Sequence, residues 1–396
     1  MRLNLYNLKL YVHLNIYDYT LKMRQNYKLL YISETNFPND AANSIATLKM
    51  CSSFSKFAQT DLYTLSCQDN YDKLKKDFLL TNKFKIINFF KKPKRISLII
   101  RLIIFFKILK RINNKKYNYI FTRSVLISVL LSLLGHKNIL EFHHPNTGIT
   151  KYIFSIYQKF FKNKNQRFIL ITKNINKNLK IPKKKFIVLD TCIDLKNFKF
   201  KTKIKRNSCV YTGSLFKGKG FEIIYKLAKL LKNIDFYIYG KKDFLDKKNY
   251  NFNLKNLKIL PYQKYKNIPK IINSHKICLM PYSKKVHIRS SSISVENYMS
   301  PIKLFEYLAC KKVVIASRMQ VYSHILKDGF NCYLLNSENI DSWAKKINYV
   351  INNYDKIKKI RENAFSTSKK FDSQDRAKKI LLFYENFLNE ENKNIR

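Results

Sequence analysis

A turn rich in glycine and lysine is the first segment whose residues could do chemistry. Residues 211–221 read YTGSLFKGKGF and hold Gly213, Gly218 and Gly220, three of the seven glycines in the chain. Glycine lets backbone approach a phosphate closely, the N–H groups of a following helix can bind an anion, and Lys219 adds a positive charge. The segment is neither a Walker A motif nor a G-x-G-x-x-G fingerprint, so it indicates either a phosphate-binding turn or an ordinary turn whose glycines relieve strain.

A helix start with a lysine is the second candidate. Residues 300–309 read SPIKLFEYLA, in which Ser300 is expected as the N-cap and Pro301 as the first helical residue. A cation at Lys303, in the first turn, is disfavoured by the helix dipole by about 0.3 to 1 kcal/mol unless an anion binds there. Glu306 is expected to face away from the apolar stripe, where its oxygens could accept hydrogen bonds from the vicinal hydroxyls of a ribose. The alternative is a solvent-exposed Lys303–Glu306 pair.

Two further polar residues follow predicted strands in the first half of the chain. His143 stands in the segment EFHH, at 141–144, and is either functional or a histidine satisfied by structural contacts. Arg123 either reaches an acceptor or caps the adjacent helix.

Short apolar runs alternate with amphipathic stretches from residue 28 onward. This alternation is typical of βαβ units and parallel sheets. The predicted strands are 28–33, 61–66, 117–122, 138–142, 167–172 and 185–190, then 209–212, 235–239, 257–260, 277–281, 313–316 and 332–335. The predicted helices are 40–56, 96–112, 124–134, 221–231, 267–272, 301–309 and 340–352, with more helix from 354 to the end.

The length of 396 residues suits two domains. We expect an N-terminal extension at 1–26, a first α/β domain at 27–190, a linker at 191–207, a second α/β domain at 208–375 and a helical tail at 376–396. Ligands of such α/β domains bind at the carboxyl ends of the strands, which places the site between the two domains.

The net charge and the cysteine content limit the possible functions. The formal net charge of +51 suggests nucleic acid or an anionic membrane as a partner, but the lysines and arginines are scattered, as on a solvated basic surface. The seven cysteines are widely spaced without a C-x-x-C pair, so neither a disulfide framework nor a zinc site is predicted, and we expect a reducing, cytoplasmic location.

No segment is expected to cross a membrane. Residues 96–112 are broken by Arg101, Lys107, Lys110 and Arg111, and residues 125–134 are too short. The first segment is basic and apolar, so it either rests on the inner face of an anionic membrane, with Arg101 and Lys107 as the main contacts, or is a core helix with a few exposed cations.

The motifs of the second half, in their order, resemble glycosyltransferase family 4 of the GT-B fold. They are GSLFKGKG at 213–220, a strand ending at Gly240, LMPY at 279–282, SPIKLFEYLA at 300–309, VVIAS at 313–317 and ILKDGFNCYL at 325–334. The first half is similar more loosely, through FTRS at 121–124, EFH at 141–143 and IDLKNF at 193–198. The resemblance therefore covers nearly the whole chain.

The resemblance implies an α/β protein with two Rossmann-like, doubly wound domains facing across a cleft. It implies a retaining, metal-independent transfer of a sugar from a nucleoside-diphosphate sugar, with no other cofactor, to a cell-envelope or polysaccharide-precursor acceptor, including a lipid-linked one. Glu306 would bind the ribose, and His143 would face the transferred sugar. The diphosphate would be held by Gly213, Ser214, Lys219 and Gly220 and by the helix start at Ser300, Pro301, Ile302 and Lys303.

Three positions depart from the family pattern. Ser214 stands where an arginine is usual, Tyr298 lies at the position of the first of two glutamates, and Lys311 replaces a glycine after the helix. Because of these departures, the alternative remains that the chain has the same fold but impaired catalysis. A basic protein that binds nucleic acid is a further alternative, although we expect no specific nucleic acid.

Overall fold

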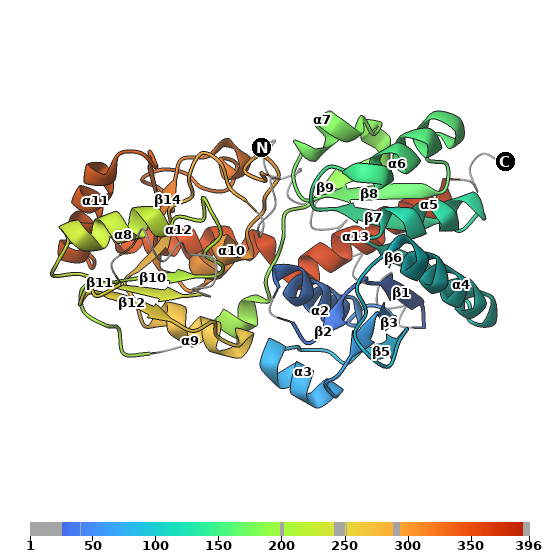
Figure 1. Ribbon diagram of the computed structural model, residues 1–396, viewed down its shortest axis with the longest axis horizontal. Helices are drawn as coiled ribbons and strands as arrows, with labels where there is room; N and C mark the ends of the chain where they lie inside the picture. Colours follow the sequence, from blue (N-terminus) through green and yellow to red (C-terminus); the bar gives the residue numbers. More distant parts are fainter. Residues whose placement is uncertain are drawn as a thin grey trace, which may run out of the picture.

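The chain forms two parallel α/β sheets side by side, each covered by helices (Figure 1). The computed structural model describes residues 26–39, 41–198, 202–240, 250, 252–287 and 294–390. The predicted extension at 1–26 therefore lies outside the described residues, except for residue 26.

The first sheet has seven strands in the order β5-β3-β1-β6-β7-β8-β9, and every neighbouring pair is parallel. All carboxyl ends therefore meet at one edge. The strands are β1 (Lys28–Ile32), β3 (Gln59–Thr64), β5 (Lys85–Asn88), β6 (Tyr119–Thr122), β7 (Asn138–Phe142), β8 (Gln166–Leu170) and β9 (Phe186–Val188). A separate two-stranded pair, β2 (Asn36–Phe37) with β4 (Ser66–Cys67), was not predicted.

Helices cover both faces of this sheet because its strands are apolar on both sides. Leu29 and Tyr31 of β1 pack with α2 residues in one core, whereas Leu30 and Ile32 pack with residues of α4 and α5 in another. The helices are α2 (Ala42–Phe54), α3 (Tyr71–Phe78), α4 (Leu98–Asn114), α5 (Val125–Leu133), α6 (Gly148–Phe161) and α7 (Ile175–Leu179).

The second sheet has six strands in the order β12-β11-β10-β13-β14-β15, again all parallel. They are β10 (Ser208–Thr212), β11 (Asp235–Tyr239), β12 (Leu257–Leu260), β13 (Ile277–Met280), β14 (Val313–Ser317) and β15 (Tyr333–Leu335). The helices of this domain are α8 (Phe221–Leu230), α9 (Ile268–Asn273), α10 (Ile302–Ala309), α11 (Ile340–Asn352) and α12 (Lys358–Ser368). Short 3-10 helices lie at Lys183–Lys185, Leu195–Phe198, Tyr265–Asn267, Gln320–Tyr322 and Lys369–Phe371.

The last helix, α13 (Ser373–Asn389), returns to the first domain and packs against α2. It begins at Ser373, so the predicted tail boundary at 376 falls inside this helix. The two chain crossings between the domains are bonded to each other. Ile193 N–H donates to the Phe371 carbonyl at 3.1 Å, and Ser373 N–H donates to the Ile193 carbonyl at 2.7 Å.

Within the described ranges, no helix is long and apolar enough to cross a bilayer. Lys311, which replaces a glycine after α10, adopts a left-handed conformation with a φ of 56°, the conformation that glycine usually provides at the end of a helix.

Candidate active site

The glycines of the turn between β10 and α8 are required by its packing. Gly220 is the N-cap residue of α8 and has a φ of 100°, which L side chains rarely adopt. A Cβ atom at Gly220 would lie 2.2 Å from the Pro281 carbonyl oxygen. Relief of strain, one of the two readings of this turn, is therefore part of the explanation.

Gly213 brings this turn against the start of α10. A Cβ atom at Gly213 would lie 2.9 Å from Lys303 Nζ, so the missing side chain leaves room for the ammonium group. Helix α10 is tied to β10 by Tyr307, whose hydroxyl accepts a hydrogen bond from Thr212 N–H at 2.9 Å. The turn and the helix start, 90 residues apart in the sequence (213 and 303), thus form one site.

Two lysines converge on this site over aromatic rings. Lys303 Nζ lies 3.6 Å from the centroid of the Tyr211 ring and 5.7 Å from that of Tyr282, and Lys219 Nζ lies 5.2 Å from the Tyr282 centroid. Burial lowers the pKa of Lys219 to about 8. Burial, and then the charge of Lys219, holds the pKa of Lys303 well below its usual range. Two crowded, desolvated cations form a site that an anion would stabilise.

Neither ammonium group forms an ion pair with a carboxylate in the part of the chain that the structure describes. Lys217, two residues before Lys219, is exposed. The structure therefore separates two lysines that look equivalent in the motif.

Glu306 is buried, with 6% of its surface exposed, so the alternative of a solvent-exposed Lys303–Glu306 pair is wrong. Burial raises the pKa of Glu306 to about 7, against the effects of Lys303, a hydrogen bond with Tyr265, and Lys49. At neutral pH this carboxyl group is therefore divided between its charged and neutral forms.

Lys49 was missed by the sequence analysis. It lies in α2 of the first domain, is 3% exposed, and donates from Nζ to the Leu79 carbonyl at 2.6 Å. Its Nζ lies 5.2 Å from the ring centroid of Tyr265, and burial lowers its pKa to about 8. A lysine on the buried side of a helix is the only signal that the sequence offered, and it does not reveal the partner.

Ser300 does not cap α10, so this prediction is wrong. The N-cap residue is Pro301, without a side-chain cap, and Ile302 and Lys303 form the first turn. Ser300 Oγ instead accepts from Thr191 N–H at 3.1 Å and donates to Asp190 Oδ1 at 3.1 Å. The residue therefore ties the start of α10 to the crossing between the domains and leaves the helix N–H groups uncapped.

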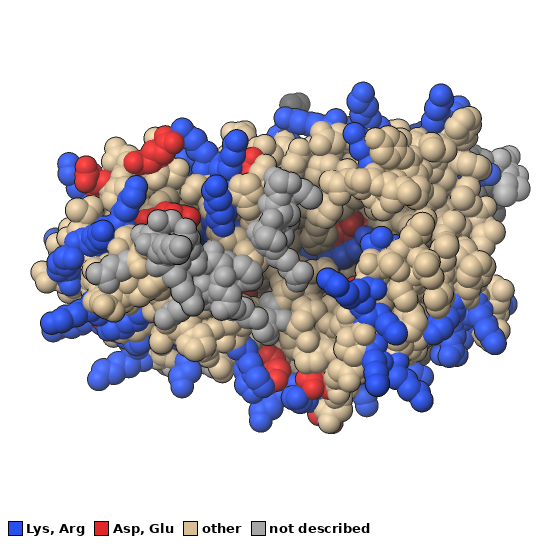
Figure 2. Space-filling view, in the orientation of Figure 1, with Lys and Arg blue, Asp and Glu red and all other residues tan. Residues whose placement is uncertain are grey.

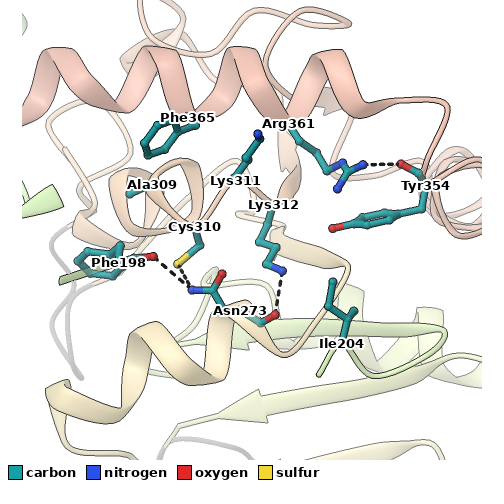
Figure 3. Close-up of a pocket in the computed structure, with 10 residues that line it drawn as sticks. All are labelled: Phe198, Ile204, Asn273, Ala309, Cys310, Lys311, Lys312, Tyr354, Arg361 and Phe365. Carbon is teal, nitrogen blue, oxygen red and sulfur yellow. Dashed lines mark hydrogen bonds between the residues drawn. The ribbon is translucent and has the colours of Figure 1, made fainter. Parts of the chain in front are cut away.

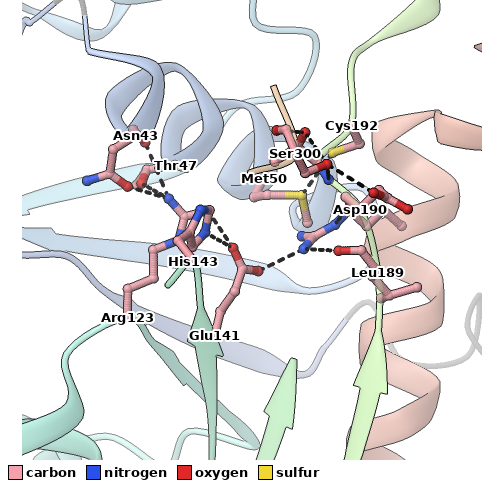
Figure 4. Close-up of polar contacts among 12 residues, drawn as sticks. Asn43, Thr47, Met50, Arg123, Glu141, His143, Leu189, Asp190, Cys192 and Ser300 are labelled. Atoms are coloured by element: carbon pink, nitrogen blue, oxygen red, sulfur yellow. Dashed lines mark hydrogen bonds and ion pairs between the residues drawn. The ribbon is translucent and has the colours of Figure 1, made fainter. Parts of the chain in front are cut away.

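His143 belongs to a buried polar cluster in the first domain (Figure 4). Its Nε2 lies 2.5 Å from Glu141 Oε1, which also accepts from Arg123 Nη2 at 2.7 Å. Glu141 Oε2 accepts from Arg376 Nη2 at 3.0 Å. Burial alone would raise the pKa of Glu141, but Arg376 and Arg123 hold it well below its usual range.

The same cluster fixes the protonation state of His143. Burial and then Arg123 lower its pKa to about 4, so the ring is neutral at pH 7. Because Nε2 faces a carboxylate, the proton is assigned to Nε2, and Nδ1 is left as the acceptor. Arg123 contacts Asn43 and Thr47 of α2 as well as Glu141, so it does not cap the adjacent helix.

A chain of contacts joins His143 to the start of α10 (Figure 4). Arg376, of α13, bonds Glu141 through Nη2 and donates from Nε to the Asp190 carbonyl at 2.8 Å. Asp190 Oδ1 in turn accepts from Ser300. The surface between the two domains is hollowed, with acidic and basic side chains visible in the hollow (Figure 2).

The positions that depart from the family pattern have structural contacts. The Ser214 carbonyl accepts from the Tyr211 hydroxyl at 2.8 Å. The Tyr298 hydroxyl accepts from Asn178 Nδ2 at 3.2 Å, and Glu296 Oε2 accepts from Val286 N–H at 3.2 Å. Glu296 therefore holds a loop and does not replace the missing carboxylate.

A second hollow lies behind α10, at the linker (Figure 3). Its cations are engaged within the protein: Lys312 Nζ donates to the Asn273 carbonyl at 2.8 Å, and Arg361 Nη2 donates to the Tyr354 carbonyl at 3.2 Å. Among the described residues, no group of three His, Cys, Asp or Glu side chains could hold a metal ion.

Comparison with known proteins indicates a broad class of enzyme. Residues 194–367 match the family model described as "Glycosyl transferases group 1", which supports a glycosyltransferase. None of the curated proteins matches the chain.

Solved structures resemble nearly the whole chain at low sequence identity. A glycosyltransferase from Rickettsia africae ESF-5 superimposes with a TM-score of 0.71 at 14% identity, covering 92% of this chain and 99% of that one. Anabaena HepE in complex with UDP has a TM-score of 0.67 at 12% identity, covering 91% and 100%; it has also been solved with UDP-glucose. WaaG, a glycosyltransferase involved in lipopolysaccharide biosynthesis, has a TM-score of 0.59 at 10% identity, covering 89% and 99%. These similarities confirm the predicted fold of two Rossmann-like domains.

Proposed function

We propose that this chain is a retaining glycosyltransferase of the family 4 type, which moves a sugar from a nucleoside-diphosphate sugar without a metal ion. The acceptor is a cell-envelope or polysaccharide precursor, reached at the cytoplasmic face of an anionic membrane. The observation that carries this proposal is the convergence of Lys219 and Lys303 on the Tyr282 ring, with Lys303 against Gly213 and both pKa values lowered by burial.

The two lysines can do the work that a divalent cation does in other transferases. As the bond between the anomeric carbon and the diphosphate oxygen breaks, negative charge grows on the departing diphosphate. Donors already positioned at that place stabilise the transition state more than the ground state. The uncapped N–H groups at Ile302 and Lys303 add positive electrostatic potential at the same place.

Glu306 and His143 act on the neutral parts of the donor. Glu306 can accept hydrogen bonds from the ribose hydroxyls, and the proximity of Lys303 favours its charged form. His143 is held neutral, so its Nδ1 can accept a hydrogen bond from a hydroxyl of the transferred sugar. UDP in the Anabaena structure supports a uridine donor as the first to test.

The test is release of nucleoside diphosphate from a panel of nucleotide sugars in the presence of a chelator, with water as the acceptor of the sugar. We expect release with at least one donor, and a rise in melting temperature, since a ligand at 100 times its Kd stabilises the fold by about 2.7 kcal/mol. Turnover that needs added magnesium or manganese would contradict the metal-independent mechanism. Donor binding without any turnover would favour the catalytically impaired alternative, and salt-sensitive binding of DNA or RNA without donor binding would favour the nucleic-acid alternative.

Affinity for UDP should fall as the pH rises above about 8. Free Lys219 loses its proton there, whereas the bound diphosphate keeps it charged, so binding takes up a proton. One proton corresponds to about a tenfold loss per pH unit, and Lys303 adds to the same trend. Calorimetric titration between about pH 7 and pH 9.5 measures this slope.

Lys219→Arg is the control, because a guanidinium keeps its charge over this whole range and should make the slope shallower. An affinity that does not change with pH in the unmodified protein would show that neither lysine contacts the diphosphate.

A further inference from the structure

Helix α4 carries an apolar stripe that faces solvent. Its inward side is formed by Ile104, Phe105 and Ile108, which are buried against the sheet. The opposite side consists of Leu98, Ile99, Leu102, Ile103 and Phe106, which are 46%, 70%, 38%, 38% and 65% exposed. A helix that is apolar on both sides is unusual at a water-exposed surface.

Helix α6 repeats this pattern. Phe154 and Tyr157 pack inward, whereas Ile149, Tyr152, Ile156 and Phe160 recur at helical spacing on the outside. Their exposed fractions lie between 58% and 69%. Helix α5 packs against both α4 and α6, so the two stripes belong to one layer of helices.

We call this surface the apolar face, formed by the exposed apolar residues of α4 and α6 together with Leu133 and Leu134 at the end of α5. In Figure 2 it corresponds to a broad uncharged area on the first domain, with lysines and arginines at its margins. Contiguous apolar area of this kind marks an interaction site, in contrast to single scattered residues.

Cations predominate in the segment that forms the apolar face. Glu141 is the only acidic residue between positions 85 and 165, and it is 2% exposed. Exposed cations line the margins: Lys91, Lys92, Lys94 and Arg95 precede α4, and Lys151 and Lys159 lie on α6. A partner must therefore offer both an apolar region and negatively charged groups.

We propose that the apolar face rests on an anionic lipid bilayer, with α4 and α6 in the plane of the interface. Apolar stripes enter the acyl boundary while the marginal lysines and arginines meet the headgroups. A bilayer fits better than a protein partner because the face is wide and apolar and carries exposed cations before α4 and on α6.

This placement brings the membrane to the candidate active site. The strands are parallel, so the basic segment after β5 and the loop after β7 lie at the same edge of the sheet. His143 stands in that second loop, and α6 begins at Gly148, directly after it. The inference rests on the proposed function in one respect, since it makes the acceptor a lipid-linked one.

Arg101 and Lys107, the cations predicted from the sequence to touch the membrane, also form contacts within the domain. Arg101 forms two hydrogen bonds with Glu34, at 2.8 and 2.9 Å. Lys107 Nζ donates to the Phe89 carbonyl at 2.6 Å and lies 4.5 Å from the Phe90 ring centroid. Lys107 remains exposed, so the apolar stripes add to the contact that the sequence predicted for the cations.

Sedimentation of the full chain with vesicles tests this inference. We expect retention on phosphatidylglycerol–phosphatidylcholine vesicles at low salt, weaker retention at high salt, and little on phosphatidylcholine alone. Phe106→Ser combined with Phe160→Ser should weaken retention by about tenfold or more, because two large side chains lose their apolar burial. The matched control is Leu230→Ser with Phe330→Ser, which removes two residues 54% and 53% exposed on the second domain.

Equal weakening by the control pair, or no retention of the unmodified chain, would overturn the proposal. A dimer in sedimentation velocity that becomes a monomer in the Phe106/Phe160 variant would also overturn it, because a second copy would then cover the face. Release of nucleoside diphosphate measured without vesicles should be unchanged in that variant. Since this readout needs no lipid, failure of the proposed function and failure of the membrane contact are distinguishable.

Discussion

Lys219→Ala should slow sugar transfer by about a hundredfold to a thousandfold, whereas Lys217→Ala should stay within a few fold of the unmodified enzyme. Each change removes one positive charge, so effects of net charge on the fold and on long-range attraction are nearly matched. Only the local contact differs: Lys219 Nζ lies beside the Tyr282 ring near Lys303, and Lys217 is exposed. Turnover is measured as nucleoside diphosphate release at saturating donor.

Stability provides the control for this prediction. Burial lowers the pKa of Lys219 to about 8, so its charge destabilises the folded state at pH 7, and that cost is relieved as the pH rises through 8 toward the ordinary value. The alanine variant should therefore melt at the same or a higher temperature while it loses activity. If Lys217→Ala is the slower enzyme, Lys217 and not Lys219 binds the diphosphate. If neither variant is slow, this turn is not the donor site.

The regular elements of the fold were predictable where local sequence determines them. The bounds of β7, β11, β12 and α11 agree with the predicted 138–142, 235–239, 257–260 and 340–352. Helix α6 was not among the predicted helices, although its apolar residues recur at helical spacing. The pair β2–β4 was missed because strands of two residues leave no pattern.

The motifs of the candidate site could be predicted from the sequence, but the contacts between distant elements could not. The glycines and the helix start place Lys219 and Lys303 together, and the sequence showed both. The burial of Glu306 was not predicted, because Lys49 and Tyr265, which lie near it, come from other elements. The partner of Glu141 on α13 lies 235 residues away in the sequence, and no local pattern indicates such a contact.

The two polar clusters have opposite electrostatic characters, and this distinguishes their roles. At the turn, Lys219 and Lys303 repel each other, and their pKa values are lowered, so the site costs stability until an anion enters. Around Glu141 the charges are paired, and the pKa of the carboxyl group is held low. The first arrangement suits binding, and the second suits positioning of His143.

Glu141→Leu should lower the free energy of unfolding by about 3 to 5 kcal/mol, the second large effect that we expect. The change leaves Arg123 and Arg376 buried without the carboxylate that both contact, and Arg376 is only 6% exposed. Urea unfolding at pH 7, followed by circular dichroism, measures the loss. The matched control is Glu362→Leu, which removes a carboxylate 3.6 Å from Lys311 at the surface and should cost about 0 to 1 kcal/mol.

The pH dependence of stability should identify Glu141 independently. Because the folded-state pKa of Glu141 is lowered, its contribution is fully present above the unfolded-state pKa and is lost as the pH falls toward the folded-state value. The difference between the unmodified protein and Glu141→Leu should therefore shrink as the solution becomes acidic below about pH 4.3, the ordinary glutamate value. His143 should lose its fixed tautomer in the variant, which nitrogen-15 NMR of the imidazole reports. An unfolding free energy within about 1 kcal/mol of the unmodified protein would show that the two arginines are satisfied without Glu141, and that His143 is positioned by other contacts.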